Sequence, residues 1–465
     1  MTCNEDEALL ERLGEDAEYL GDPFNTWPSN RQDILDVAED IWQRVAERYS
    51  GSSSTRLNLV CLSIAALGDY LSQALADIAR ARGVDDDARS AIWLLPESVC
   101  RPLLCSMKNW CPNRLHGFLN AQSCTVGVLW YLANLKPPSV HDGHRTCTAE
   151  QCSSLHVDWH DYTINHISRG CRCALIGPST EEMARIVRRG SIALFNVQHD
   201  SGRARVTVQD ETRAGERTWQ SDGELSADLC ARETAERGRR TRSLIDEDSS
   251  TKTHTPIWMD TICLPRYPLD IRREAILRLS DVFRNATGVL VLDSYLQALE
   301  CSDMPPMEVL ARISISGWTS RLWTFSEGYL ARRIWFQFYD KAIYLHDLMS
   351  HWQEALTLRI PANPLTGVSY EMTTLYSATS LLGSHQEEQQ QQPGLGNIKV
   401  ALTSRQNSWP SDEALCLGAI LDLDLSKIVY ADDNKKMAAF WRQREAVPIE
   451  ILFFRCLPKI EDSGC

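Results

Sequence analysis

Two continuous apolar segments, separated by the pattern of an amphipathic helix, constrain the fold of this chain most strongly. Residues 257–263 (IWMDTIC) and 288–293 (GVLVLD) show no alternation of polar and apolar side chains, and apolar residues recur at helical spacing across 271–286. Strands covered on both faces show such runs, and an intervening helix is typical of a right-handed crossover between parallel strands. We therefore expect an α/β fold with a mainly parallel sheet core, in which residues 334–339 form a third neighbouring strand.

The remainder of the chain divides by composition into regions that flank this core. Helical periodicity predicts large helical regions on both sides, and a run of Gln, Glu, Gly and Pro predicts one linker. The expected regions are an N-terminal helical region (1–136), a Cys/His-rich module (137–200), a charged insertion or diverged first strand (201–256), the α/β core (257–342), a helical extension (343–382), a low-complexity linker (383–396) and a C-terminal helix and strand region (397–465).

Composition excludes several classes of protein. The chain has 62 acidic against 48 basic residues and a formal net charge of −14, which argues against nucleic-acid binding because that requires a basic face. The sequence contains no stretch of about 18 uninterrupted apolar residues, so we expect no membrane span. The first residues are acidic and lack the apolar run of a secretory signal, so the 16 cysteines should be reduced thiols in a cytoplasmic protein.

A cluster of cysteines and one histidine follows the first helical region. Four thiols and an imidazole at this density could form a tetrahedral structural zinc site, although C-x4-C followed by C-x-C is not a standard pair of spacings. The alternative is a set of buried, reduced cysteines that pack as small apolar side chains. The candidate ligands are Cys147, Cys152, His166, Cys171 and Cys173, with His141, His144, His156 and His160 as further candidates.

Three charged residues stand out within the predicted core. Asp260 lies toward the carboxyl end of an apolar strand, which is where open α/β sheets bind ligands. Glu327 lies on a predicted helix with no basic residue three or four positions away, and Arg321 is the nearest cation in sequence. A carboxylate in such surroundings is either paired through space or has a raised pKa, so both a functional and a purely structural role remain open.

Signatures of several enzyme classes do not occur in the sequence. There is no G-x-x-x-x-G-K-[ST], no G-x-G-x-x-G after a strand, no H-E-x-x-H and no G-x-S-x-G. The sequence therefore does not support assignment to the P-loop ATPases, the Rossmann dehydrogenases, the zincins or the α/β-hydrolases.

The same segments resemble the fungal heterokaryon-incompatibility (HET) domain family. The family's W-[IM]-D-x-[IL]-C strand matches 258–263, its next strand matches 289–293, and its W-x-x-R-x-W-x-x-x-E-x-x-L-A block follows in the family's order. Its opening strand has only a weak counterpart at 218–223 (TWQSDG). The matching residues of the block are Trp318, Arg321, Trp323, Glu327, Leu330 and Ala331, and a later segment matches at Arg405, Ser408, Asp412 and Glu413.

The resemblance implies a signalling or interaction protein of fungal non-self recognition that leads to programmed cell death through protein partners. It also implies a core similar to Toll/interleukin-receptor (TIR) domains, some of which cleave NAD. In that alternative Glu327 would be the catalytic carboxylate, with Asp260 and Arg321 shaping the pocket. A further alternative is a catalytically inactive, zinc-stabilised scaffold.

Overall fold

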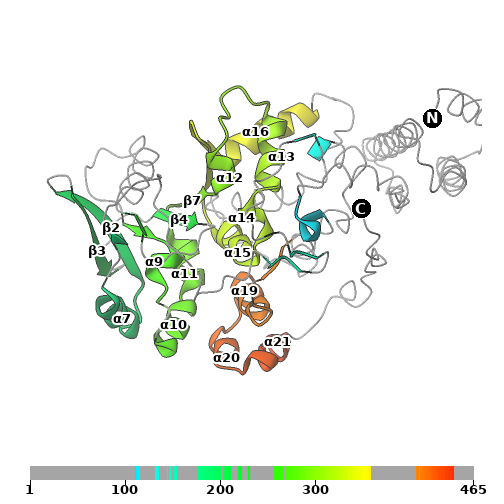
Figure 1. Ribbon diagram of the computed structural model, residues 1–465. Coiled ribbons are helices and arrows are strands. Elements are labelled where there is room, and N and C mark those ends of the chain that lie inside the picture. The colour runs from blue at the N-terminus through cyan, green and yellow to red at the C-terminus, as the bar shows by residue number, and fades with distance from the viewer. Residues whose placement is uncertain are drawn as a thin grey trace, which may run out of the picture.

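The computed structural model describes two parts of the chain in most detail, the α/β core and a helical cluster that follows it (Figure 1). Shorter pieces come from the upstream Cys/His region. The predicted N-terminal helices before residue 110, the linker at 383–396 and the C-terminal strand lie outside the described residues. The described residues are 110–115, 131–132, 134–135, 144, 146–148, 151–153, 175–176, 179–200, 203–210, 218–222, 229–230, 256–265, 268–357, 405–407 and 409–444.

A seven-stranded sheet with the strand order β3-β2-β6-β4-β7-β8-β9 forms the centre of the fold. A separate two-stranded antiparallel sheet joins β1 (Leu175–Ile176) to β5 (Leu229–Cys230). The strands of the large sheet are β2 (Ala193–Asp200), β3 (Arg203–Asp210), β4 (Thr218–Asp222), β6 (Ile257–Trp258), β7 (Gly288–Leu292), β8 (Ile334–Gln337) and β9 (Ala342–Tyr344).

The expectation of a mainly parallel, TIR-like core is wrong, because the sheet is mixed. Parallel pairing is confined to the middle, where β4 lies between β6 and β7 and β7 pairs with β8. The outer pairs β2–β3, β2–β6 and β8–β9 are antiparallel. Short connections join β2 to β3 and β8 to β9, and a short connection can return a strand only antiparallel to its neighbour. Our prediction rested on continuous apolar runs and did not include β3 and β9, the antiparallel partners of β2 and β8.

Residues 201–256 contribute strands to the sheet. The weak counterpart of the expected opening strand at 218–223 forms β4, which occupies the centre of the sheet and pairs in parallel on both sides. The segment Thr218–Asp222 is thus a strand of the sheet. Strand β4 also separates β6 from β7, which we expected to be neighbours. The predicted strand at 257–263 is shorter than expected: β6 ends at Trp258, and Asp260–Cys263 forms the short helix α9.

Two predicted helices are each broken into two. The segment 271–286 forms α10 (Leu269–Ile276) and α11 (Leu279–Asn285), and the segment 318–332 forms α14 (Gly317–Ser320) and α15 (Leu322–Leu330). The remaining helices are α7 (Thr180–Arg188), α12 (Ser294–Gln297), α13 (Pro306–Ser314), α16 (Leu345–Thr357), α19 (Asp412–Ile420), α20 (Ser426–Val429), the 3-10 turn η4 (Asp433–Lys435) and α21 (Lys436–Trp441).

Local chemistry explains where some of these elements begin and end. The Ser179 hydroxyl caps α7 by accepting the backbone N–H of Glu182 at 3.3 Å, and Gly190 ends that turn at a φ of 78°, which favours glycine. Gly288 opens β7 because the Trp335 ring of the next strand lies against it. A Cβ atom at position 288 would come within 2.1 Å of that ring.

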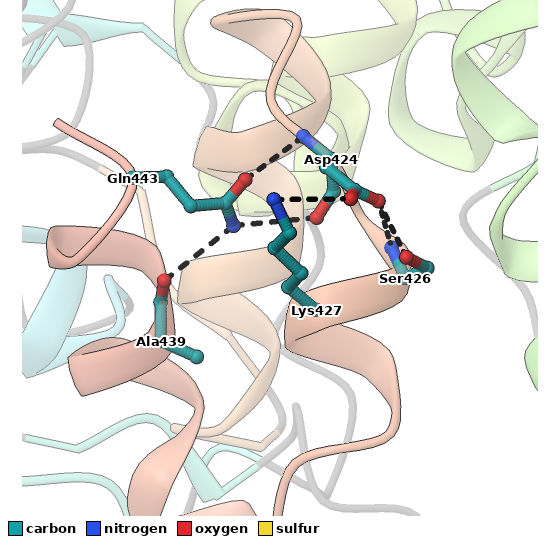
Figure 2. Close-up of polar contacts among 5 residues, drawn as sticks. All are labelled: Asp424, Ser426, Lys427, Ala439 and Gln443. Atoms are coloured by element: carbon teal, nitrogen blue, oxygen red, sulfur yellow. Dashed lines mark hydrogen bonds and ion pairs between the residues drawn. The ribbon is translucent and has the colours of Figure 1, made fainter.

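The C-terminal helices close the core from below in the view of Figure 1, where α19 packs against α15. Gln443 holds this cluster together (Figure 2): its Oε1 accepts the Asp424 N–H at 3.1 Å, and its Nε2 donates to the Asp424 and Ala439 carbonyls. The Asp424 carboxylate in turn accepts the N–H of Ser426 at 3.0 Å at the start of α20. The cluster therefore presents α19, whose residues Ala414–Ile420 are all buried, to the core as one unit.

Candidate metal centre

Four potential metal ligands from the segments that precede the core in sequence lie close together. One ligand atom from each of Cys111, His144, Cys147 and Cys152 lies within 4.8 Å of the other three. The Sγ atom of Cys152 is 3.8 Å from that of Cys111 and 3.7 Å from that of Cys147. The His144 Nδ1 atom is 3.4 Å from the Cys147 sulfur and 3.5 Å from the Cys152 sulfur. The donors form a compact group that could hold a metal ion.

Backbone hydrogen bonds explain why two of the thiols meet. The Thr148 N–H donates to the Gln151 carbonyl at 2.9 Å, and the Gln151 N–H donates to the Thr148 hydroxyl at 3.2 Å. These bonds close the loop between Cys147 and Cys152. The Cys147 N–H donates to the His144 carbonyl, which turns the imidazole toward the same point. The spacing C-x4-C therefore acts as one compact ligand pair.

Cys111 lies on a different segment, which packs into the main apolar core. The neighbouring Trp110 is only 6% exposed and Leu132 is fully buried, and both belong to the principal apolar cluster. Cys111 and Cys152 are buried, whereas His144 and Cys147 are partly exposed. A bound ion would therefore join the 144–153 loop to a segment that is already part of the core.

Neighbouring groups shift the proton affinities of the cluster in a consistent direction. The hydrogen bond with Cys152, followed by burial, raises the pKa of the Cys111 thiol. Hydrogen bonds with Cys152 and Cys147 raise the pKa of His144 against the opposing effect of burial. Crowded thiols resist ionisation unless a cation balances their charge. Metal binding provides such a cation and releases protons from the ligands.

The Cys147 sulfur also receives support from outside the ligand set. The Ser153 N–H donates to this sulfur at 3.2 Å, and the Ser153 hydroxyl lies at the same distance. Outer contacts of this kind orient metal ligands and tune their affinity. Cys147, the more exposed of the clustered thiols, is therefore fixed in direction by its own loop.

The sequence-based ligand set is only partly represented in this cluster. Cys147 and Cys152 come together as predicted, and His144 was one of the further candidates. His166, Cys171 and Cys173 lie outside the described residues. Cys111 was missed, because it lies far upstream in the N-terminal region predicted as helical and has no partner at metal-ligand spacing. Only the preceding Trp110, a residue type that favours burial, hinted that this position reaches the core.

The three candidate catalytic residues lie on or directly before two helices, α9 and α15. Glu327 lies on α15 and is 6% exposed, on a helix that packs against α11 and α19. Asp260 opens α9, which packs against β2 and β4. Arg321 lies in the extended break between α14 and α15, where its N–H bonds to the Trp318 carbonyl. The packing partners of α9 and α15 are thus different elements.

Arg405, which belongs to the last matching segment of the family, explains that break. Its guanidinium donates to the Arg321 carbonyl at 2.7 Å and to the Thr324 hydroxyl at 2.8 Å. The same group lies 5.3 Å from the centre of the Trp318 ring and 5.1 Å from that of Phe325. Arg405 therefore connects the break between α14 and α15 to aromatic side chains on both helices.

A buried polar node that the sequence did not reveal lies at the carboxyl end of β7. The Asp293 side chain, 4% exposed, accepts the N–H groups of Tyr295 at 3.0 Å and Leu296 at 3.3 Å through Oδ1. Its Oδ2 accepts the Trp318 N–H at 3.0 Å, so one carboxylate starts both α12 and α14. Arg114, three residues after Cys111, donates to the Ser316 carbonyl beside this node and interacts electrostatically with Asp293.

Comparison with known proteins identifies no relative. No protein-family model, no curated protein and no solved structure matches this chain. Among the described residues, no helix is long and apolar enough to cross a membrane.

Proposed function

We propose that this chain is an intracellular interaction protein of the heterokaryon-incompatibility type, stabilised by a zinc ion bound to Cys111, His144, Cys147 and Cys152. It acts through protein partners, and its metal centre has a structural role. The order of the motifs that match the family supports the first part of the proposal. These motifs form β6, β7 and α15, and Arg405 of the last motif donates a hydrogen bond to the backbone between α14 and α15.

The geometry of the four donors carries the zinc part of the proposal. In a tetrahedron with zinc–sulfur bonds of about 2.3 Å and a zinc–nitrogen bond of about 2.05 Å, sulfurs are about 3.8 Å apart and sulfur and nitrogen are about 3.6 Å apart. The corresponding separations are 3.7 and 3.8 Å between sulfurs and 3.4 and 3.5 Å between sulfur and nitrogen. Four edges of the group thus match the size of a zinc tetrahedron to within about 0.2 Å.

The composition of the donor set favours a structural over a catalytic ion. Three thiolates and an imidazole fill all four positions of a tetrahedral zinc ion, whereas catalytic zinc keeps one position open for water or substrate. A closed site of this kind contributes its binding free energy to folding. The centre therefore serves to hold the 144–153 loop on the core.

The zinc proposal is tested by elemental analysis of protein purified without chelator. Wild-type protein and Cys171→Ser should each contain about one zinc ion per chain, and Cys111→Ser should contain less than about a tenth of that. EDTA should lower the melting temperature of the wild type. Zinc retained by Cys111→Ser, or lost equally in Cys171→Ser, would contradict this ligand set.

The interaction part is tested separately by induced expression of the full chain in a filamentous fungus. Wild-type protein should arrest growth, and Cys111→Ser should do so weakly at matched protein levels, because it lacks the ion that stabilises the fold. Unimpaired growth with wild-type protein at high level would count against a role in cell death. That result would leave the zinc proposal intact.

A further inference from the structure

We propose that Arg114 couples the metal centre to the carboxyl end of β7, so that metal occupancy and the order of the α13–α14 connection depend on each other. The inference rests on the metal centre proposed above. It makes Arg114 a positioning residue that acts on the zinc ion through charge, and on the core through one hydrogen bond.

The position of Arg114 follows from its place on the short helix that Cys111 precedes. The Leu115 N–H donates to the Cys111 carbonyl at 3.1 Å, which fixes this turn directly beside the metal ligand. From the same turn, the Arg114 Nη2 atom donates to the Ser316 carbonyl across a long sequence separation. Any shift of Cys111 therefore moves the anchor of the guanidinium.

The charges around Arg114 are balanced only when both neighbours are in place. Burial lowers the pKa of Arg114, whereas Asp293, Cys111 and Cys152 each favour its charged form. Zinc with three thiolates and an imidazole would carry one net negative charge, which would be a permanent anion near the guanidinium. Asp293 supplies a second negative charge. Because removing one partner of a charge that is partly withdrawn from water is costly, the two sites should stabilise each other through Arg114.

The far end of this connection is a part of the core with little freedom to adjust. Ser316 is fully buried, and its carbonyl also accepts the Thr319 hydroxyl at 2.9 Å. The next residue, Gly317, lies so close to Asp293 that an added Cβ would be 3.0 Å from the carboxylate. Residues 316–318 are thus held by two contacts: Arg114 donates to the Ser316 carbonyl, and Asp293 accepts the Trp318 N–H.

The first test needs no variant. Hydrogen exchange of the full-length protein is followed by mass spectrometry with and without stoichiometric zinc. Zinc should slow exchange of the amides in 314–320 and leave 424–443 in the C-terminal cluster unchanged. Equal exchange of 314–320 in zinc-loaded and zinc-free protein would overturn the coupling.

The second test measures zinc affinity by competition with a chromophoric chelator. Arg114→Met, which keeps the apolar stem but loses the charge, should bind zinc about 10–100-fold more weakly, which is the usual effect of losing an outer contact of a metal site. Arg114→Lys should recover part of that loss. Arg284→Met, which removes a partly exposed cation paired with Asp422, serves as the control and should bind as the wild type does.

The possible results separate this inference from the zinc proposal. Wild-type protein that binds no zinc would refute the zinc centre and the coupling together. Wild-type binding with an unchanged affinity in Arg114→Met, within about twofold, would refute the coupling alone. A weakened affinity in Arg114→Met together with zinc-independent exchange of 314–320 would also refute it, because the effect would then stop at the metal.

Discussion

Replacing Asp293 by alanine removes a single acceptor that serves three backbone N–H groups at the end of β7. Loss of the cap at α12 costs about 1 kcal/mol, and leaving the buried Trp318 N–H without its acceptor costs about 1–3 kcal/mol. Arg114 also loses an opposite charge. We expect a loss of about 2–5 kcal/mol in the free energy of unfolding, seen as a fall in melting temperature of about 4 °C or more.

A conservative variant and a surface control make this prediction specific. Asp293→Asn keeps an oxygen for the Tyr295 and Leu296 N–H groups but turns its amide nitrogen toward the Trp318 N–H, so it should lose about 1–3 kcal/mol. Asp422→Asn removes an exposed ion pair with Arg284 at a φ of 55°, which asparagine tolerates, and should change stability by less than about 1 kcal/mol. An Asp293→Ala melting temperature equal to that of Asp422→Asn would refute the node.

Three further changes test other parts of the structure. Gly288→Ala should destabilise the protein by about 1–3 kcal/mol in thermal unfolding, because its Cβ would lie 2.1 Å from the Trp335 ring; wild-type stability would contradict the packing of β7 on β8. Asp340 has a lowered pKa because it accepts hydrogen bonds from Ser302 and the Cys301 N–H, so its contribution is present above its unfolded pKa of about 3.9 and is lost as the pH falls. Asp340→Asn should therefore flatten the decline of melting temperature between about pH 5 and 3, and an unchanged decline would argue against this role. Purified protein should release no nicotinamide from NAD, because Glu327 is only 6% exposed, and Glu327→Gln should act on the melting temperature alone; turnover that Glu327→Gln abolishes would restore the catalytic alternative.

Sequence patterns anticipated those parts of the fold that depend on local burial. Continuous apolar runs located β7 and β8. The apolar run at 257–263 was misassigned beyond Trp258, because burial on all sides gives the same composition in a short strand and in the helix α9. The centre of the sheet was left open between a strand and an insertion, because β4 has a polar sequence and owes its place to pairing on both sides.

The candidate site was predictable only as far as its ligands are close in sequence. Cys147 and Cys152 form one loop, and their spacing signals a ligand pair. Cys111 and Asp293 reach their partners through tertiary packing, for which sequence spacing carries no signal. The same limit applies to Arg405, whose contacts lie on a distant helix break.

The zinc centre is the claim on which most of this account depends, and X-ray absorption at the zinc edge tests it most directly. The measurement reports the atoms bound to zinc in the intact protein. We predict three sulfurs at about 2.3 Å and one nitrogen at about 2.0–2.1 Å, with the nitrogen contribution absent or replaced in His144→Ala. A shell made only of light atoms, or an unchanged sulfur and nitrogen shell in His144→Ala, would contradict the assignment of Cys111, His144, Cys147 and Cys152 as the ligands.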